Sequence, residues 1–346
     1  MHVPSPRLGG LALGLAALGL AALGLAALAP SAHAQTQDLF VSNGSGNTIS
    51  RFAGTGPGTF STTATTLSGL SGPEGLAFDA GGDLFAANGN SNSITEFAST
   101  GAGTFATGIT FATGGTLNNP RGLAFDARGD LFAAEYGNNS ITEFASTGAG
   151  TFATGTTFAT GLNGPFGLAV DARGDLFAAN VGTNSITEFA STGAGTFATG
   201  TTFATGGTLS LPAGLAFDAG GDLFAAQYGN NSITEFAFNS GTGTFATGTT
   251  FATGGTLNAP LGLAFDARGD LFAANISGNS VTEFASTGTG TFAAGKTVET
   301  GLNGPTFLAF SPAPAVPEAS TTVSLGLLLA LGMGGMVVAA RKKRQA

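Results

Sequence analysis

Two short apolar runs, separated by a polar turn, recur five times along the middle of the chain. The first run reads GLAFD or GLAVD and the second reads DLFAA, as expected for short β-strands that are buried on both faces. The turn between them begins with Asp and contains Gly, two residues that favour tight turns. The five copies occupy residues 72–88, 119–135, 164–180, 211–227 and 259–275.

Each pair of runs is followed by an SITEF-like stretch and then by a Thr/Phe/Gly-rich segment such as GTFATGTTFATG. The mixed SITEF stretch predicts a third strand, and the Thr/Phe alternation of TFAT predicts an outer fourth strand. Helical periodicity is absent from these repeats. The sequence therefore predicts an all-β fold built from repeated four-stranded units.

The ends of the repeat array complete each other. The Asp that ends each first run falls at positions 79, 126, 171, 218 and 266, at steps of 45 to 48 residues. The array opens at Asp38 with a second half-unit and closes at Gly304 with a first half-unit, which gives six halves of each kind. A ring explains this division, because the C-terminal strand can then pair with the N-terminal strands and leave no long free edge. We therefore expect a six-bladed β-propeller over residues 35–311, closed by N- and C-terminal half-blades.

Residue types suited to catalysis and metal binding are scarce. The chain has no Cys, and its two histidines, His2 and His33, lie in an N-terminal segment that we expect to be removed. A mature chain would then have neither Cys as a nucleophile nor His as a general base, and it would lack the usual zinc and copper ligands. Residues 35–317 carry 19 acidic and six basic side chains, a net charge of −13, which repels nucleic acid. We expect no catalytic residue, no metal, no cofactor and no nucleic-acid partner.

Residues 1–34 have the order of a secretory signal peptide. Arg7 precedes an apolar run at residues 8–29, and the segment ends in Ala32-His33-Ala34. A basic start, an apolar run and an Ala-x-Ala end predict cleavage after Ala34. The alternative is a membrane anchor, since the apolar run is about as long as a bilayer span.

The C-terminal end has three parts: a Pro-rich linker at residues 312–320 that contains Pro317 and Glu318, an apolar stretch at 321–340, and a basic tail at 341–346. The apolar stretch is long enough to cross a bilayer, and the basic tail would stay in the cytoplasm. This order resembles the PEP-CTERM sorting signal of Gram-negative bacteria. The resemblance implies transient anchoring in the inner membrane, cleavage by an exosortase, and delivery to the cell surface or extracellular matrix. The alternative is a plain C-terminal membrane anchor.

The repeated unit P-x-GLAFD-x-x-GDLFAAN-x-x-x-NSITEF resembles the NHL repeat, over nearly all of residues 38–311. That family forms β-propellers that mostly bind proteins, nucleic acids or other ligands. Many NHL repeats carry Asp at the end of the second strand, where this chain has Asn43, Asn88, Glu135, Asn180, Gln227 and Asn275. The unit is also similar to that of the streptogramin lyases, whose histidine base has no counterpart in a mature chain without His.

Repeats this alike are informative where they differ, and two positions in each unit vary. The residue after the proline is Glu74, Arg121, Phe166, Ala213, Leu261 or Thr306, and the residue after the second-strand polar position is Gly44, Gly89, Tyr136, Val181, Tyr228 or Ile276. Both positions flank the inner strands, so we expect them on loops around the central channel. The candidate ligand-binding residues are Glu74, Arg121, Glu135, Tyr136, Phe166, Gln227 and Tyr228. The alternative is that unconstrained loop positions simply drift.

Two further patterns are explained by the turns. Asp pairs four residues apart, such as Asp79 and Asp83, offer oxygen ligands to calcium, but each pair brackets a tight turn, which favours a turn-forming role. Arg-Gly-Asp triplets begin at Arg128, Arg173 and Arg268. Two sister turns carry Gly-Gly-Asp instead, so turn chemistry explains these triplets too.

These patterns together predict a non-enzymatic propeller, exported to the cell surface or extracellular matrix, that binds exopolysaccharide or a surface protein at the mouth of its channel. Its other partners would be the secretion machinery and an exosortase, and it would meet a membrane only through the C-terminal segment. Two alternatives stay open: a passive structural coat component, and a lyase or hydrolase that uses Glu74 or Glu135 in place of histidine.

Overall fold

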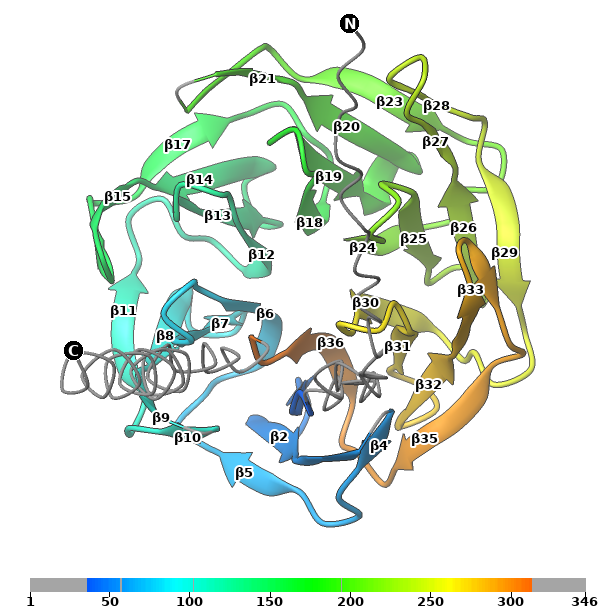
Figure 1. Ribbon diagram of the computed structural model, residues 1–346. Coiled ribbons are helices and arrows are strands. Elements are labelled where there is room, and N and C mark those ends of the chain that lie inside the picture. The colour runs from blue at the N-terminus through cyan, green and yellow to red at the C-terminus, as the bar shows by residue number, and fades with distance from the viewer. Residues whose placement is uncertain (1–35, 57, 102, 194, 313–346) are drawn as a thin grey trace, which may run out of the picture. The chain divides into compact units, whose positions relative to one another are not determined.

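The computed structural model describes residues 36–312, except residues 57, 102 and 194. Within these residues, six four-stranded antiparallel sheets form a ring around a central axis (Figure 1). The all-β, six-bladed propeller predicted from the repeat is therefore confirmed. Blades 1 to 6 are numbered here in the order of their innermost strands.

Each blade presents its four strands in the same order from the axis to the rim. The innermost strands begin at the repeated proline and are β6 (Pro73–Phe78), β12 (Pro120–Phe125), β18 (Pro165–Val170), β24 (Pro212–Phe217), β30 (Pro260–Phe265) and β36 (Pro305–Phe310). The second strands are β7 (Leu84–Asn88), β13 (Leu131–Glu135), β19 (Leu176–Asn180), β25 (Leu223–Gln227), β31 (Leu271–Asn275) and β1 (Leu39–Asn43).

The two outer positions of each blade are more polar. The third strands are β8 (Ser93–Phe97), β14 (Ser140–Phe144), β20 (Ser185–Phe189), β26 (Ser232–Phe236), β32 (Ser280–Phe284) and β2 (Thr48–Phe52). The fourth strands are β11 (Ile109–Thr113), β17 (Thr156–Ala159), β23 (Thr201–Thr205), β29 (Thr249–Thr253), β35 (Lys296–Thr300) and β5 (Thr65–Leu67). A 3₁₀ turn, η1 (Val181–Thr183), follows β19.

Burial follows this order. Every residue of the second strands is buried, because neighbouring blades cover both faces of each sheet. The fourth strands are mostly exposed at the rim. This difference explains why the second strands read as continuous apolar runs, whereas the outer strands alternate Thr with Phe or Ala.

The ring is closed at blade 6, where the C-terminal strand β36 pairs antiparallel with β1, with Leu39 opposite Phe310 and Val41 opposite Leu308. The predicted closure by two half-blades is thus present. Ser42 stands at this seam in a position that the other second strands fill with Ala. Its buried hydroxyl donates to the Glu74 carbonyl oxygen (2.6 Å) and accepts from the Phe307 backbone N–H (2.9 Å). The hydroxyl therefore links blade 6 to blade 1.

The sequence analysis did not predict a two-stranded hairpin that each unit inserts between its third and fourth strands. The hairpins are β9 (Ser99–Gly101) with β10 (Thr104–Phe105), β15 (Ser146–Gly148) with β16 (Thr151–Phe152), β21 (Ser191–Gly193) with β22 (Thr196–Phe197), β27 (Phe238–Asn239) with β28 (Thr244–Phe245), β33 (Ser286–Gly288) with β34 (Thr291–Phe292), and β3 (Gly54–Gly56) with β4 (Thr59–Phe60). The first TF pair of each unit thus belongs to a hairpin, and TTFAT or its equivalent forms the fourth strand.

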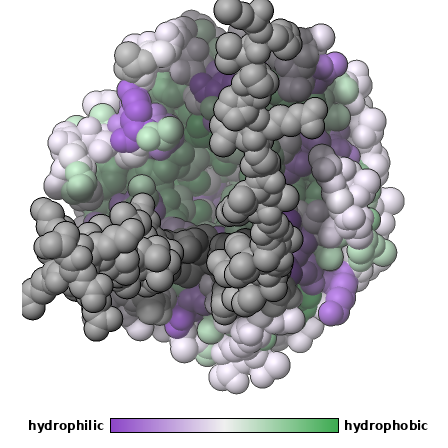
Figure 2. Space-filling model, in the orientation of Figure 1, coloured by the Kyte–Doolittle hydropathy of each residue, from purple (hydrophilic) through white to green (hydrophobic). Residues whose placement is uncertain are grey.

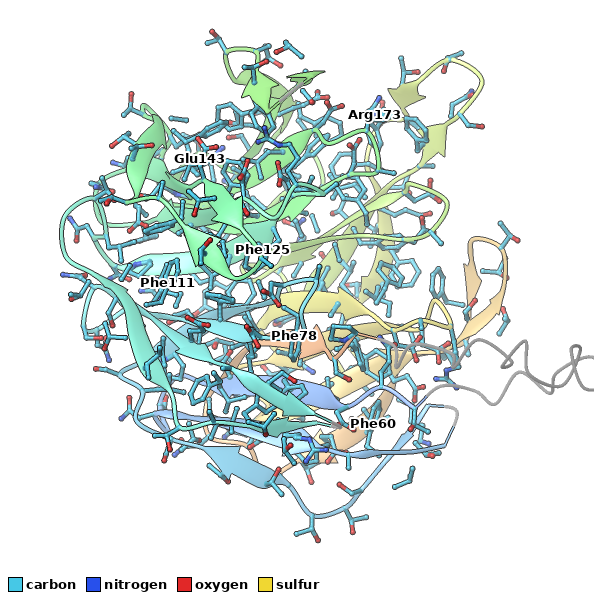
Figure 3. All side chains as sticks on the ribbon, turned by 60° about the vertical axis from the view of Figure 1, so that its left-hand side comes forward. Phe60, Phe78, Phe111, Phe125, Glu143 and Arg173 are labelled. Atoms are coloured by element: carbon cyan, nitrogen blue, oxygen red, sulfur yellow. The ribbon has the colours of Figure 1, made fainter. Side chains whose placement is uncertain are left out.

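The Phe residues of the hairpins cover the seams between blades. Phe152 of the blade 2 hairpin lies 5.7 Å from Phe85 and 5.1 Å from Phe111 of blade 1, measured between ring centroids. Phe125 of blade 2 completes the same edge-to-face cluster, 5.2 Å from Phe85. Figure 3 labels Phe111 and Phe125 in this seam. Equivalent clusters at the other seams account for much of the high Phe content.

The expected leader and sorting segments lie outside the described residues. Ala34 precedes the described residues, and Pro317 and Glu318 follow them. Within residues 36–312, no helix is long and apolar enough to cross a bilayer.

Candidate functional site at the mouth of the central channel

The innermost strands approach one another backbone to backbone, and glycine makes this possible. Gly75, Gly122, Gly167 and Gly214 each follow the variable residue of an innermost strand. A Cβ atom at any of them would lie within 3.0 Å of a carbonyl oxygen in the next blade. Only glycine fits such a close approach. The variable residue between the proline and this glycine lies at the mouth of the narrow channel, where opposite blades meet.

One side of this mouth is apolar. Phe166, Ala213, Leu261 and Phe307, from four different innermost strands, form one buried cluster. Phe166 and Phe307 belong to opposite blades, yet their rings are stacked 5.8 Å apart at an angle of 17°. The channel is therefore closed at this level by side chains. Figure 2 shows the opposite end of the ring, where Gln37 contacts Ala267 and Ser311, and apolar residues, in green, are visible there toward the centre.

The other side carries an ion pair. Glu74 of β6 and Arg121 of β12 form a salt bridge between adjacent blades. Only 8% of the Glu74 surface is exposed. Its Oε2 atom and the Arg121 Nε atom are buried without a hydrogen-bond partner. Burial raises the pKa of Glu74 to about 7, against the opposing effect of the Arg121 guanidinium.

Tyr136 covers this ion pair. The Arg121 guanidinium lies 5.3 Å from the centre of the Tyr136 ring and 5.4 Å from that of Phe166, within cation–π range of both. The Tyr136 and Phe166 rings meet edge to face at 6.4 Å. Tyr136 nevertheless remains 41% exposed. The mouth thus presents an aromatic face that is held from below by a cation and a second ring.

The structure brings four of the seven candidate residues together: Glu74, Arg121, Tyr136 and Phe166. Tyr228 lies two blades further around the same mouth, in the position equivalent to Tyr136, and it is 42% exposed. The expectation that the residues after the prolines lie on loops needs correction, because Glu74, Arg121 and Phe166 are inside innermost strands. Phe307, which replaces the glycine of the other units, is the site residue that the sequence analysis missed.

Glu135 and Gln227 have a different position from the one expected, because both are fully buried inside their blades. Glu135 Oε2 accepts the backbone N–H of Asn118 (2.7 Å), and Gln227 Oε1 accepts that of Ser210 (2.7 Å). Asn88 holds the backbone N–H of Ser71 in the same way. The position therefore fixes the loop before the repeated proline, and its residue does not reach the surface of the mouth.

The Asp pairs at the opposite end of the innermost strands form turns, as interpreted. Asp79 Oδ1 accepts the backbone N–H of Asp83 (2.8 Å), and Gly82 between them adopts a positive φ of 88°. Asp83 Oδ1 in turn accepts the backbone N–H of Ser99 and so anchors the hairpin (2.7 Å). Within the described residues, no group of three or more His, Cys, Asp or Glu side chains is arranged to hold a metal ion.

Comparisons with known proteins identify the fold. Neither a protein-family model nor a curated protein sequence matches the chain. A chain from the crystal structure of a nidogen–laminin complex is 19% identical, covers 80% of this chain and 99% of its own, and superimposes with a TM-score of 0.64. A streptogramin B lyase is 18% identical and covers 79% of this chain and 80% of its own, with a TM-score of 0.53. The gluconolactonase XC5397 of Xanthomonas campestris is 20% identical and covers 71% of this chain and 84% of its own, with a TM-score of 0.54. At these identities the comparisons support the propeller fold that the NHL resemblance implies. Both binding partners and enzymes share this fold, so function has to be argued from the site.

Proposed function

We propose that the chain is an exported, non-enzymatic propeller of the cell surface or extracellular matrix of a Gram-negative bacterium, and that it binds exopolysaccharide at the channel mouth. The observation that carries this proposal is the exposed Tyr136 ring, held over Arg121 and against Phe166. A ring fixed in this way stacks on the apolar face of a sugar with little loss of side-chain entropy.

The polar groups of the mouth suit sugar hydroxyls. Arg121 keeps 23% of its side chain exposed beside Tyr136, whereas the unpaired Glu74 Oε2 and Arg121 Nε atoms are buried. A sugar hydroxyl accepts hydrogen bonds, so it suits the exposed part of the Arg121 guanidinium. The net charge of −13 over residues 35–317 favours a neutral polymer over an anionic one.

The end segments supply the proposed location. Cleavage after Ala34 would release the chain from the secretion machinery, and the segment with Pro317 and Glu318 would direct it to an exosortase. The measurement is the mass of the protein recovered from the matrix. We expect it to begin at Gln35 and to lack residues 321–346, whereas a recovered protein that keeps either segment contradicts this part of the proposal.

Co-sedimentation of the chain with the producing organism's exopolysaccharide tests the binding. We expect saturable binding that the Tyr136→Ala/Tyr228→Ala variant weakens about fivefold or more, since each of the two aromatic contacts contributes about 0.5–1.5 kcal/mol. Ile109→Ala is the control, because Ile109 is 60% exposed on the outer strand β11. Equal binding by all three proteins would place the polysaccharide elsewhere. Absence of binding would refute the proposal and favour a protein partner or a passive coat.

One observation favours a second candidate, a lyase or hydrolase without histidine. A carboxyl with a pKa of about 7 can exchange protons at neutral pH, and Glu74 combines that pKa with a cationic neighbour at the mouth. Glu135 has a similar pKa but is sealed inside its blade. Polysaccharide cleavage that Glu74→Gln abolishes and Glu135→Gln spares would establish this candidate, and intact polymer after prolonged incubation would exclude it.

A further inference from the structure

Three of the Asp turns at the end of the ring opposite the candidate site hold an arginine side chain. Arg128 pairs with Asp126 and Asp130, Arg173 with Asp171 and Asp175, and Arg268 with Asp266 and Asp270. In each turn the guanidinium uses the Oδ2 atoms of the two carboxylates. The Oδ1 atoms are already engaged by backbone N–H groups, as Asp126 and Asp130 show. A turn of this kind is therefore a two-carboxylate receptor for a guanidinium group.

The hairpin of the next blade completes the receptor. Arg173 donates to the carbonyl oxygen of Gly243 (3.1 Å) and lies 5.1 Å from the ring centre of Phe238 and 5.7 Å from that of Phe245, all in the blade 4 hairpin. Figure 3 shows Arg173 beside this hairpin. Arg128 and Arg268 reach the next hairpins too, since Cβ atoms at Gly195 and Gly58 would collide with their guanidinium groups.

Blades 1 and 4 have the same turns but carry Gly81 and Gly220 in place of the arginine. The Oδ1 atoms are engaged as in the sister turns: Asp79 accepts from Asp83, and Asp83 accepts from Ser99. Their Oδ2 atoms are the counterparts of those that bind guanidinium elsewhere. Among the described residues, no basic side chain forms an ion pair with the carboxylates of these two turns.

Glycine leaves an open crevice between blades 1 and 2. Its volume is about 870 Å³, and it is lined by Asp79 and Asp83, by Phe152 of the blade 2 hairpin, and by Asp126 and Arg128 of the neighbouring blade 2 turn. Phe152 holds the hairpin position that Phe245 holds under Arg173. A Cβ atom at Gly150, or at Gly290 in the equivalent seam between blades 4 and 5, would have no atom within 4 Å, and the same is true of Gly243 beside Arg173. The turns at the seams of Gly150 and Gly290 lack arginine.

The acidic groups at these seams also influence a third carboxyl. The pKa of Glu96 is raised by burial and further by the charges of Asp83 and Asp79, and Glu235 is affected in the same way by Asp222 and Asp218. At the sister positions the charge of Arg128 or Arg173 opposes this effect. A cation bound in the crevice would relieve the repulsion among the three carboxylates.

We propose that the crevice at Asp79/Asp83 and the equivalent seam at Asp218/Asp222 each bind an arginine side chain of a partner protein. The guanidinium group would bridge the two Oδ2 atoms and lie against the hairpin of the next blade, as Arg173 does within the chain itself. This site lies at the opposite end of the innermost strands from Tyr136, so it is independent of the proposed polysaccharide site.

The test uses the full chain and a radiolabelled acetyl-Gly-Arg-Gly-amide peptide in equilibrium dialysis. The blocked ends leave the guanidinium as the only charge, and the same peptide with citrulline in place of arginine is the control for hydrogen bonding without charge. We expect two equivalents of the arginine peptide per chain, weakening as salt is raised, and binding of the citrulline peptide at least tenfold weaker. Equal binding of the two peptides, or no binding of either, would overturn the proposal.

Variants of the chain locate the binding. Gly81→Arg/Gly220→Arg recreates the Asp-Ala-Arg-Gly-Asp sequence that folds in three sister turns, so it should fill both sites and lower the affinity for the peptide at least tenfold. Arg173→Gly empties a third receptor, at the seam between blades 3 and 4, and should raise the stoichiometry from two to three. Unchanged binding by the filled variant would refute the assignment, whatever the outcome of the polysaccharide experiments.

Discussion

Glu135 is a carboxylate in a position that other blades fill with an amide. Replacing it tests whether burial raises the pKa of this carboxyl group and so makes the folded protein less stable at neutral pH. Asn88, Asn180 and Asn275 each donate from the side-chain amide to a Thr hydroxyl on the third strand (2.9 Å). In blade 2 the equivalent atoms, Glu135 Oε1 and Thr142 Oγ1, are buried without a partner. Glu135→Gln supplies the missing amide donor. We therefore expect it to stabilise the protein.

The size of the effect follows from the pKa. Burial raises the pKa of Glu135 from 4.5 to about 7, and this outweighs the lowering of the pKa by the Asn118 backbone N–H and by the nearby Thr142 hydroxyl. Each pKa unit corresponds to about 1.4 kcal/mol, so the ionised carboxylate lowers the free energy of unfolding by about 3 kcal/mol. Between these two pKa values the folded state binds more protons than the unfolded state, so stability falls as pH rises. The full stability is present below pH 4.5 and is lost as the pH passes about 7.

The assay is urea unfolding of the full chain and of Glu135→Gln, followed by circular dichroism at several pH values from 4.5 to 8.5. We expect the variant to gain about 3 kcal/mol over the wild type between the ends of this range, with equal m-values. Glu74 and Glu299 also have pKa values raised to about 7, so the wild type and the variant both lose stability in the same window. Their contribution cancels in the difference between the two proteins.

Gln227→Glu is the matched control, because Gln227 occupies the same position in blade 4 and is also fully buried. Relative to the wild type, Gln227→Glu should lose free energy of unfolding as the pH rises from 4.5 to 8.5, whereas Glu135→Gln should gain it. A stability difference that stays constant from pH 4.5 to 8.5 would show that Glu135 ionises normally in the folded state. The reasoning from burial would then be refuted.

Three further substitutions test the packing. Gly122→Ala should prevent the blades from closing, because its Cβ would collide with the Phe166 carbonyl oxygen. Its circular dichroism spectrum should differ from that of the control Gly241→Ala, which changes an exposed hairpin residue, and equal spectra would contradict this expectation. Ser42→Ala should lower the free energy of unfolding by about 1–3 kcal/mol, measured by urea unfolding, because it leaves polar groups at the closing seam without a partner. Phe85→Ala should cost about 3–5 kcal/mol in the same assay, since the ring is fully buried among other Phe rings, and a loss under 1 kcal/mol would indicate a loosely packed seam.

The fold could be predicted from the sequence because its units are nearly identical. The unpaired half-units at Asp38 and Gly304 indicated a closed ring, and β36 does pair with β1. The hairpins were missed because strands such as Thr104–Phe105 and Thr151–Phe152 have only two residues, too few to show a period. Their role depends on packing against the preceding blade, which no local pattern records.

The candidate site could be predicted only in part. Variation after the proline identified Glu74, Arg121 and Phe166, because these positions face the channel and no common packing constrains them. The position of Glu135 and Gln227 varies for another reason. The side-chain oxygen of Glu, Gln or Asn can accept the same backbone N–H of the loop before the proline, so any of these residues fits. Phe307 was detectable as the residue that replaces a glycine of the other five units, but its stacking on Phe166 across the channel required the closed ring.

The protein has its own probe for the proposed polysaccharide site. The chain contains two Tyr and no Trp, and both tyrosines, Tyr136 and Tyr228, are at the channel mouth. The most direct measurement is therefore tyrosine fluorescence of the full chain during titration with the producing organism's exopolysaccharide. We expect a saturable change that Tyr136→Phe reduces. The Tyr136→Ala/Tyr228→Ala variant has no tyrosine emission, so its weaker binding is measured by sedimentation. Binding detected by sedimentation without any change in tyrosine emission would place the polymer away from the mouth and contradict the proposed function.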